Sequence, residues 1–422
     1  MTAGLPNDCF DYDRGHISLS GALDMLQIRL QPLADTESVS LAEAAGRVLA
    51  QPLTSPRPVP AFDNAAVDGF AFAAASQRNT GPVRLALAPG RAAAGHPAVA
   101  AVPPGHAIRV LTGAALPRGT DTVAMNEEVQ VERSTVVLPR PLLPNSNRRR
   151  AGEDVRAGQE LFGEGVLLRP MHLGVAAELG LETLPVFRRL RVALHSSGDE
   201  LRAPGGVLDE GGVFDANRFM LKAMLRQLPV EVDDRGILPD NAEAVRAALL
   251  ASAENHDVIL TSGGASKGDE DHVVRTVEAH GRLDFWQIAM KPGRPLAFGR
   301  LRRAVTIGLP GNPVAAAVCF MRLARPVIAR LAGSKWLEPQ AFCVPAAFSL
   351  EKKPGRTELL RARLIVNDET GKPKAELIRR QGSGILTSLT DADGLIEVDP
   401  EVTLIEQGKP VRFLSFAELG AA

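Results

Sequence analysis

Three loops that combine glycine with polar side chains each follow a short apolar segment, and they span residues 196–201, 261–272 and 308–313. Glycine lets a ligand approach the backbone, and successive free N–H groups ahead of a helix form a nest for phosphate. Gly-Gly and Gly-Asn-Pro also occur in plain turns, so the three loops together indicate more than any one alone. We predict a phosphate-binding site with these candidate residues: Ser197, Gly198, Ser262, Gly263, Gly264, Pro310, Gly311 and Asn312.

Acidic residues lie in or beside the same loops. Like charges about 4 Å apart repel by roughly 4 kcal/mol at an effective dielectric of 20, so carboxylates in one cleft usually need a cation. Hard oxygen ligands beside phosphate favour Mg²⁺, which bridges one or two carboxylates to substrate phosphates. We expect the metal ligands to be Glu200, Asp240 and Asp271. A simpler interpretation, acids at helix N-termini that the helix dipole favours, stays open for Asp199, Glu200, Asp269 and Glu270.

Alternating strands and helices must position these loops. Strand-like segments at 191–197, 230–238, 257–262 and 304–310 alternate with helical patterns at 215–228, 241–255, 271–281 and from Pro313 onward. This alternation predicts right-handed βαβ crossovers and a mostly parallel sheet. Ligands of such sheets bind beyond the carboxyl ends of the strands, which is where all three loops lie.

The remaining sequence predicts a multidomain α/β protein. Helical patterns at 18–33 and 38–50 precede a segment rich in proline, glycine and short β-branched runs, and helical character returns at 171–181. The final residues again read as short strands between turns. We therefore predict a discontinuous N-terminal elongated domain of residues 16–50 and 146–187, an inserted β domain (51–145), an α/β domain (188–335) and a C-terminal β domain (336–422).

Composition excludes several classes of partner. A chain of 422 residues is too long for one hydrophobic core. Its formal net charge of -1, from 48 basic and 49 acidic residues, attracts neither nucleic acid nor an anionic membrane. The cysteines Cys9, Cys319 and Cys343 are far apart, and an acidic N-terminus replaces the basic and apolar run of a signal peptide. We expect a cytoplasmic protein that acts on small molecules.

Several longer motifs carry a resemblance to a known family. "SSGDEL" (196–201), "TSGGASKGDEDH" (261–272), "MKPGRPLAFG" (290–299) and "GLPGNPVAA" (308–316) resemble the molybdopterin-binding domain of molybdenum-cofactor biosynthesis proteins. The chain as a whole is similar to the molybdopterin molybdenumtransferase family, which includes MoeA and the E domain of gephyrin. This second resemblance rests on "PAFDNAAVDGFA" (60–71), "IRVLTGAALPRGTDTV" (108–123), "RRRAGEDVRAGQEL" (148–161), "GRTELLRARL" (355–364) and "QGSGILTSL" (381–389).

The resemblance implies an activity and a set of residues. Family members insert molybdenum from molybdate into adenylylated molybdopterin and release AMP with the help of Mg²⁺. A homodimer with an active site shared between subunits is also implied, with molybdopterin adenylyltransferase and molybdoenzyme chaperones as protein partners. The implied catalytic residues are Asp68, Thr112, Asp154, Glu200, Asp240 and Asp271. The groups implied to hold molybdate are Lys291, Arg356 and Ser383.

The sequence departs from the family pattern at a few positions. Gln287 stands where some members have lysine, and Arg294 replaces the usual lysine, so the cationic groups are rearranged. Ala65 and Phe70 each lack a hydroxyl found in related motifs, whereas Asp68 is retained.

Alternative functions stay open at this point. They are a molybdopterin adenylyltransferase, a non-catalytic scaffold of the gephyrin type, and a nucleotide-binding module without catalysis. Simpler interpretations also stay open for the molybdate residues: Arg356 and Ser383 as surface loop residues, and Lys291 as a solvated strand end.

Overall fold

The computed structural model describes residues 17–264, 271–366 and 371–422. Contacts divide the chain into two compact units. Unit 1 comprises the described residues of Met1–Gln51, Glu164–Arg169 and Thr183–Ala422, and unit 2 comprises Pro52–Gly163 and Pro170–Glu182. The finer division into four domains stays a prediction. Within the described residues, every helix is too short or too polar to cross a bilayer.

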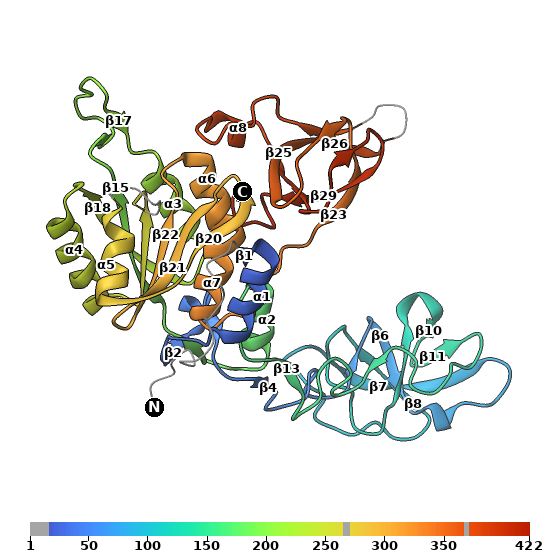
Figure 1. The fold of residues 1–422 in the computed structure, drawn as a ribbon. Helices are drawn as coiled ribbons and strands as arrows, with labels where there is room; N and C mark the ends of the chain where they lie inside the picture. Colours follow the sequence, from blue (N-terminus) through green and yellow to red (C-terminus); the bar gives the residue numbers. More distant parts are fainter. Residues whose placement is uncertain (1–16, 265–270, 367–370) are drawn as a thin grey trace. The chain divides into compact units, whose positions relative to one another are not determined.

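A 12-stranded sheet forms the centre of unit 1 (Figure 1). Its strands are β1 (Ile17–Ser18), β15 (Leu190–Ser197), β18 (Val230–Leu238), β19 (Val258–Ser262), β20 (Gly281–Lys291), β21 (Pro295–Leu301), β22 (Ala304–Leu309), β23 (Phe342–Pro345), β25 (Thr357–Val366), β26 (Pro373–Leu377), β27 (Gly394–Val398) and β29 (Pro410–Ser415). They run in the order β18-β15-β19-β22-β21-β20-β25-β27-β29-β23, with β1 beside β20 and β26 beside β25.

The first part of this sheet confirms the predicted parallel arrangement. Strands β18, β15, β19 and β22 pair in parallel, whereas β21 pairs antiparallel to both β22 and β20. The sheet is therefore mixed. From β25 onward its strands come from the predicted C-terminal β domain and pair antiparallel, which agrees with the short strands and turns expected there.

Helices cover both faces of the parallel strands. They are α1 (Leu19–Arg29), α3 (Asn217–Leu225), α4 (Ala242–Asn255), α5 (His272–His280), α6 (Pro313–Cys319), a π-helical turn η4 (Phe320–Ala324) and α7 (Arg325–Leu331). Helices α4 and α5 pack together over one face, around Val245, Leu249 and Val273. Helices α1, α3, α6 and α7 share the larger core on the other face (Figure 1).

Local sequence signals explain where these helices begin. The side chain of Asn241 accepts a hydrogen bond from the Ala244 N–H at 3.0 Å and so caps α4. Pro313 occupies the first turn of α6, where its missing N–H costs nothing. Both signals lie directly after strand-end loops, so they also fix where those loops end.

The helix expected at 38–50 is wrong. The structure has β2 (Thr36–Ser40), a three-residue 3₁₀ turn η1 (Leu41–Glu43) and β3 (Val48–Leu49). Both strands pair with β14 (Thr183–Phe187), so tertiary pairing outweighs helical propensity here. The Ser40 hydroxyl donates to the Glu43 carboxylate at 3.0 Å but makes no capping bond to the backbone, and the chain leaves the single turn before Gly46, which has a positive φ of 72°.

Smaller elements complete unit 1. Two-residue strands pair as β16 (Leu201–Arg202) with β17 (Val213–Phe214), and as β24 (Leu350–Glu351) with β28 (Leu404–Ile405). A single-turn helix, α8 (Thr387–Thr390), follows the loop that carries Ser383.

Unit 2 is mainly β, as predicted for the inserted segment. A 6-stranded sheet has the order β10-β11-β7-β8-β6-β9. These strands are β6 (Gly69–Phe72), β7 (Val83–Ala92), β8 (His106–Val110), β9 (Thr122–Met125), β10 (Gln130–Glu132) and β11 (Thr135–Leu138). Other elements are the pairs β5 (Asn64–Ala65) with β12 (Arg148–Arg149) and β4 (Leu53–Thr54) with β13 (Glu160–Phe162), the turns η2 (Ala74–Ser76) and η3 (Asn126–Glu128), and α2 (Pro170–Glu178).

A buried ion pair joins the helical core of unit 1 to its C-terminal strands. Arg322 in η4 lies 2.7 Å from Glu397 in β27, and both side chains are less than a tenth exposed. Removing one partner of such a pair costs roughly 3 to 5 kcal/mol, because the other charge stays buried. The N–H of Val314 also donates to the carbonyl of Ser383 at 3.0 Å. These contacts hold the Ser383 loop beside the start of α6.

A buried histidine in β15 predicts acid-sensitive folding. Burial, reinforced by the charges of Arg235 and His256, lowers the pKa of His195 from 6.5 to about 4. The unfolded chain binds this proton at higher pH than the folded chain does. Stability should therefore fall as the pH drops from 6.5 towards 4, by at most about 3 kcal/mol from this group. In His195→Gln, urea unfolding should show a shallower loss of stability over this range.

The exposed His96 offers a matched control, since His96→Gln removes a histidine from unit 2 without removing a buried group. Its stability should follow the wild-type pH dependence. Equal slopes for His195→Gln and wild type would contradict the assignment.

Candidate active site

The ends of three neighbouring strands bring the predicted glycine loops together. In the sheet register Ser196 pairs with Ser262, and Ser262 pairs with Leu309. The residues that follow β15, β19 and β22 therefore meet at one edge, as predicted. The N–H of Gly263 donates to the carbonyl of Leu309 at 3.0 Å, which closes the second loop against the third.

Close packing of the loops requires glycine at two positions. Gly263 and Gly264 have positive φ values of 91° and 66°. A Cβ at Gly263 would lie 2.3 Å from the carbonyl oxygen of Ser197, and one at Gly264 would lie 2.8 Å from the side chain of Val273. Gly311 lies on the other side, with its Cβ position 3.9 Å from the Gly263 Cα. Gly263 thus packs directly against the backbone of the first loop, and Gly264 packs against the Val273 side chain.

An asparagine that the sequence analysis missed ties the loops together. The Nδ2 of Asn217 donates to the Ser262 hydroxyl at 2.8 Å and to the Gly311 carbonyl at 2.6 Å. Asn217 is the first residue of α3, and the Ser262 hydroxyl lies 3.4 Å from the Pro310 carbonyl. The sequence does show a polar residue at the start of a predicted helix, a position that can bond a neighbouring loop, but the pattern at 215–228 predicts only the helix.

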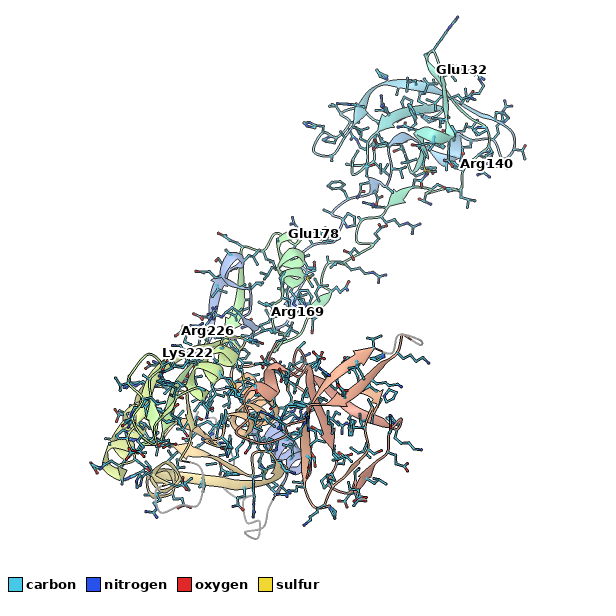
Figure 2. All side chains as sticks on the ribbon, turned by 90° about the horizontal axis from the view of Figure 1, so that it is seen from above. Glu132, Arg140, Arg169, Glu178, Lys222 and Arg226 are labelled. Carbon is cyan, nitrogen blue, oxygen red and sulfur yellow. The ribbon has the colours of Figure 1, made fainter. Side chains whose placement is uncertain are left out.

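Salt bridges hold α3 and therefore Asn217 in place. Arg218 and Lys222 of α3 both bond the carboxylate of Asp234 in β18, at 2.6 Å and 3.0 Å. The charges of Arg218 and Lys222 keep the pKa of Asp234 below its ordinary value despite partial burial. Figure 2 labels Lys222 on this helix and Arg226, the residue directly after its end.

The predicted metal ligands are brought less closely together. In the described part of the chain, no group of three or more His, Cys, Asp or Glu side chains could hold a metal ion. Asp240 lies beside the start of α5, with its carboxylate 3.7 Å from the Nε2 of His272, next to Asp271. The carboxylate of Glu200 instead folds back over Gly198. Asp269 and Glu270 lie outside the described residues.

The helix-terminus interpretation fails for the acids after β15. Asp199 and Glu200 precede the short strand β16, not a helix. Asp199 accepts a hydrogen bond from the N–H of Asp240 at 2.7 Å, so it ties the end of β18 to the loop after β15. Asp271 does precede α5, but its side chain makes no capping hydrogen bond to that helix.

A pocket of about 300 Å³ lies next to the glycine loops, at the junction of the helical core and the C-terminal strands. It brings together several predicted residues from distant parts of the sequence, namely Lys291, Pro310, Asn312 and Ser383. Arg356, the third residue predicted to hold molybdate, is exposed and is not among the residues that line this pocket.

The charge of Lys291 already has a partner. Its Nζ lies 3.4 Å from both carboxylate oxygens of Glu358, and β20 and β25 place the two residues side by side. Lys291 is thus an ion-paired residue of the pocket, and its side chain remains 55% exposed at the end of β20, so the simpler interpretation as a solvated strand end stays open.

The pocket also contains Arg361, a buried arginine that the sequence analysis missed. An arginine inside the apolar strand segment "TELLRARLIV" was the available signal.

Unit 2 holds a second predicted group. The Oδ1 of Asp68 accepts hydrogen bonds from both the hydroxyl and the N–H of Thr112, each at 2.7 Å. Chiefly because of the hydroxyl bond, the pKa of Asp68 is below its ordinary value. The next residue, Gly69, must be glycine, because a Cβ there would lie 1.8 Å from the Ala124 carbonyl oxygen. Asp68 is therefore an oriented, exposed and ionised carboxylate.

Within the described residues, no hydrogen bond links Asp154 to Asp68 or Thr112. It is exposed, and its N–H donates to the carbonyl of Val59 at 3.1 Å. The nearby Asp63 forms an ion pair with Arg148 and accepts from the Ala151 N–H at 2.8 Å, which fixes the loop around Asp154.

Comparison with family models covers most of the sequence. Residues 17–180 match the MoeA N-terminal region (domain I and II), and residues 344–416 match the MoeA C-terminal region (domain IV). Between them, residues 193–330 match a model described as "Probable molybdopterin binding domain". The glycine loops all lie in this central match.

Individual relatives agree with these matches. The molybdopterin molybdenumtransferase of Haemophilus influenzae is 38% identical over 386 residues, covering 91% of this chain and 95% of that protein. The one from Nostoc sp. is 32% identical over 397 residues, covering 92% and 90%. A crystal structure of a molybdopterin biosynthesis moeA protein from Pyrococcus horikoshii OT3 superposes with a TM-score of 0.81 at 28% identity, over 95% of this chain and 100% of that one. The chain belongs to the MoeA family of molybdopterin molybdenumtransferases.

Proposed function

We propose that this protein transfers molybdenum from molybdate to molybdopterin, and that the pterin arrives in its adenylylated form. The observation that carries the proposal is the cradle formed by the loops after β15, β19 and β22, with the pocket lined by Lys291 and Ser383 directly beside it. One site takes a phosphate-linked ligand and the other an oxyanion. Their shared residues, Pro310 and Asn312, put the two ligands within reach of each other.

The glycine loops suit a pyrophosphate. Gly263 and Gly264 present backbone without side chains, and α6 begins directly after Asn312, so its N-terminal N–H groups and dipole favour an anion. Release of AMP breaks the bond between one phosphorus and the bridging oxygen, while water supplies the new oxygen. The role of this chain is to hold the phosphates in one orientation relative to the attacking water.

Two carboxylates fit a magnesium ion bound with the substrate. Mg²⁺ ordinarily keeps waters and takes one or two carboxylates together with phosphate oxygens, so a complete protein cage is not required. Asp240 and Asp271 lie beside the start of α5. Bound there, the metal would neutralise charge that develops on the phosphates.

The pocket suits the molybdenum step. Molybdate exchanges one oxide for the two dithiolene sulfurs: two sulfur–molybdenum bonds form, and the oxide leaves as water with the two thiol protons. The oxidation state of molybdenum does not change. The hydroxyl of Ser383 and the ammonium of Lys291 can donate to the remaining oxides, because a tetrahedral oxyanion accepts hydrogen bonds on every side.

We also infer a homodimer whose active site uses Asp68 and Thr112 of one subunit with the α/β loops of the other. The support is the family resemblance of the segment 60–71 and the oriented, exposed carboxylate of Asp68. The matches at both ends of the chain favour a transferase over an adenylyltransferase, for which the central domain would suffice.

Asp271→Asn tests the metal assignment. The change keeps size but removes the charge that a hard cation requires, so AMP release should fall about a hundredfold or more. Binding of the adenylylated pterin should change little, since the backbone at Gly263 and Gly264 is intact. Glu278→Gln, which removes an exposed charge from the same helix, is the control. Near-normal AMP release in Asp271→Asn would reject the assignment.

Asn217→Ala tests the cradle. Losing the two hydrogen bonds to Ser262 and Gly311 should loosen the loops and weaken binding of the adenylylated pterin by roughly ten- to a hundredfold. Calorimetric titration measures this directly. Asn255→Ala, at the far end of α4, should bind normally. Wild-type affinity in Asn217→Ala would show that the loops do not hold the ligand.

Mixing two inactive variants tests the shared site. Asp68→Ala and Asp271→Ala subunits that exchange freely form heterodimers half of the time, and one of the two sites in each heterodimer is intact. The mixture should therefore recover about a quarter of wild-type activity. A protein that light scattering shows to be monomeric at the assay concentration would refute the dimer.

A further inference from the structure

Arg361 is a charged side chain in the interior of the C-terminal strands. It lies in the middle of β25 and is 1% exposed, the largest side chain in the described part of the chain to be so fully buried. Its Nε donates to the Ser388 hydroxyl at 3.2 Å, and its Nη2 donates to the carbonyls of Gly382 at 3.2 Å and Arg380 at 3.4 Å. All of these acceptors are uncharged.

The other buried arginines of the described chain are compensated. Arg47 forms an ion pair with Glu37, and Arg322 forms one with Glu397 at 2.7 Å. Burial lowers the pKa of Arg361, and no carboxylate acts to raise it. An isolated buried charge is costly unless a counter-charge joins it. Arg361 therefore leaves an uncompensated positive charge inside unit 1.

This charge lies at the pocket beside the glycine loops. Arg361 lines the pocket together with Asn312 and Ser383. The other cation there, Lys291, is 3.4 Å from the oxygens of Glu358, whose side chain is only 8% exposed. The positive charge of Lys291 and the negative charge of Glu358 largely cancel. The net positive charge of the pocket therefore comes from Arg361.

We propose that Arg361, more than Lys291, makes this pocket bind a tetrahedral oxyanion. The inference rests on the proposed function, in which that oxyanion is molybdate. Arg361 acts in two ways: its charge attracts the anion, and its bonds to Gly382 and Arg380 hold the loop that presents Ser383. Glu358 opposes it by neutralising Lys291, so the affinity for the anion reflects a balance of three side chains.

A simple loop clamp is the competing role, and charge variants separate the two. Calorimetric titration of the full-length protein with molybdate alone gives the affinity, and a thermal melt of the same sample gives the stability. Arg361→Gln should weaken molybdate binding by roughly ten- to a hundredfold. Arg361→Lys keeps the charge but loses the planar fork, so it should retain most of the affinity while melting lower.

Glu358→Gln should have the opposite effect on molybdate affinity. It frees the ammonium of Lys291 and should tighten molybdate binding a few-fold, a gain that a structural role does not predict. Arg379→Gln removes an exposed arginine from the same loop region and is the matched control, with binding expected within about twofold of wild type.

The inference is overturned if Arg361→Gln binds molybdate as wild type does, or if Arg361→Gln and Arg361→Lys lose affinity equally and in step with their melting temperatures. Wild-type protein that binds no molybdate at millimolar concentration would also overturn it. Molybdenum transfer by the wild type is assayed separately: transfer without dependence on Arg361 refutes this inference alone, and dependence of binding on Arg361 without transfer refutes the proposed function alone.

Discussion

Direct contact of backbone with backbone at the ends of β15 and β19 sets the geometry on which the candidate site depends. The second loop can pass Ser197 only because Gly263 has no side chain, and both Gly263 and Gly264 have the positive φ that glycine allows. The parallel register puts the third loop, at Gly311, against the same turn. Any ligand of these loops therefore meets N–H groups and hydroxyls more than apolar side chains.

Buried charge is the second constraint, and it connects the site to the rest of unit 1. Salt bridges from α3 to Asp234 hold the helix that carries Asn217, and the Arg322–Glu397 pair holds the C-terminal strands against the helical core. Each is satisfied within the protein. The pocket differs because Arg361 has only neutral acceptors, and this contrast makes it a place for an external anion.

Much of the α/β fold follows from the sequence because its signals are local. Strand-like and helical segments alternate over 191–333, and parallel pairing then requires the loops after the strands to share an edge. The segment 38–50 shows the limit: its pairing with β14 is made by residues more than a hundred positions away in the sequence. No local pattern records such a partner.

The candidate site residues divide in the same way. Motifs within one loop, such as Gly263–Gly264 and Asp68, could be recognised from the sequence. The sequence offers Asn217 only as a polar residue at a helix start, because its acceptors are 45 and 94 residues further along the chain. Lys291 also acquires its role from a partner on another strand, Glu358, and Arg361 from acceptors in the loop after β26 and in α8. Arg356, chosen by its motif, lies outside the pocket, because motif position does not determine where a side chain on an exposed loop lies.

The most direct test of the account is a crystal structure of this protein with adenylylated molybdopterin and molybdate. The account predicts the pyrophosphate against the backbone of Gly263 and Gly264, within hydrogen-bond distance of the Ser262 or Asn312 loops, and the oxyanion in the pocket of Lys291, Arg361 and Ser383. Phosphates bound away from the ends of β15, β19 and β22, or an oxyanion held elsewhere with that pocket empty, would contradict it.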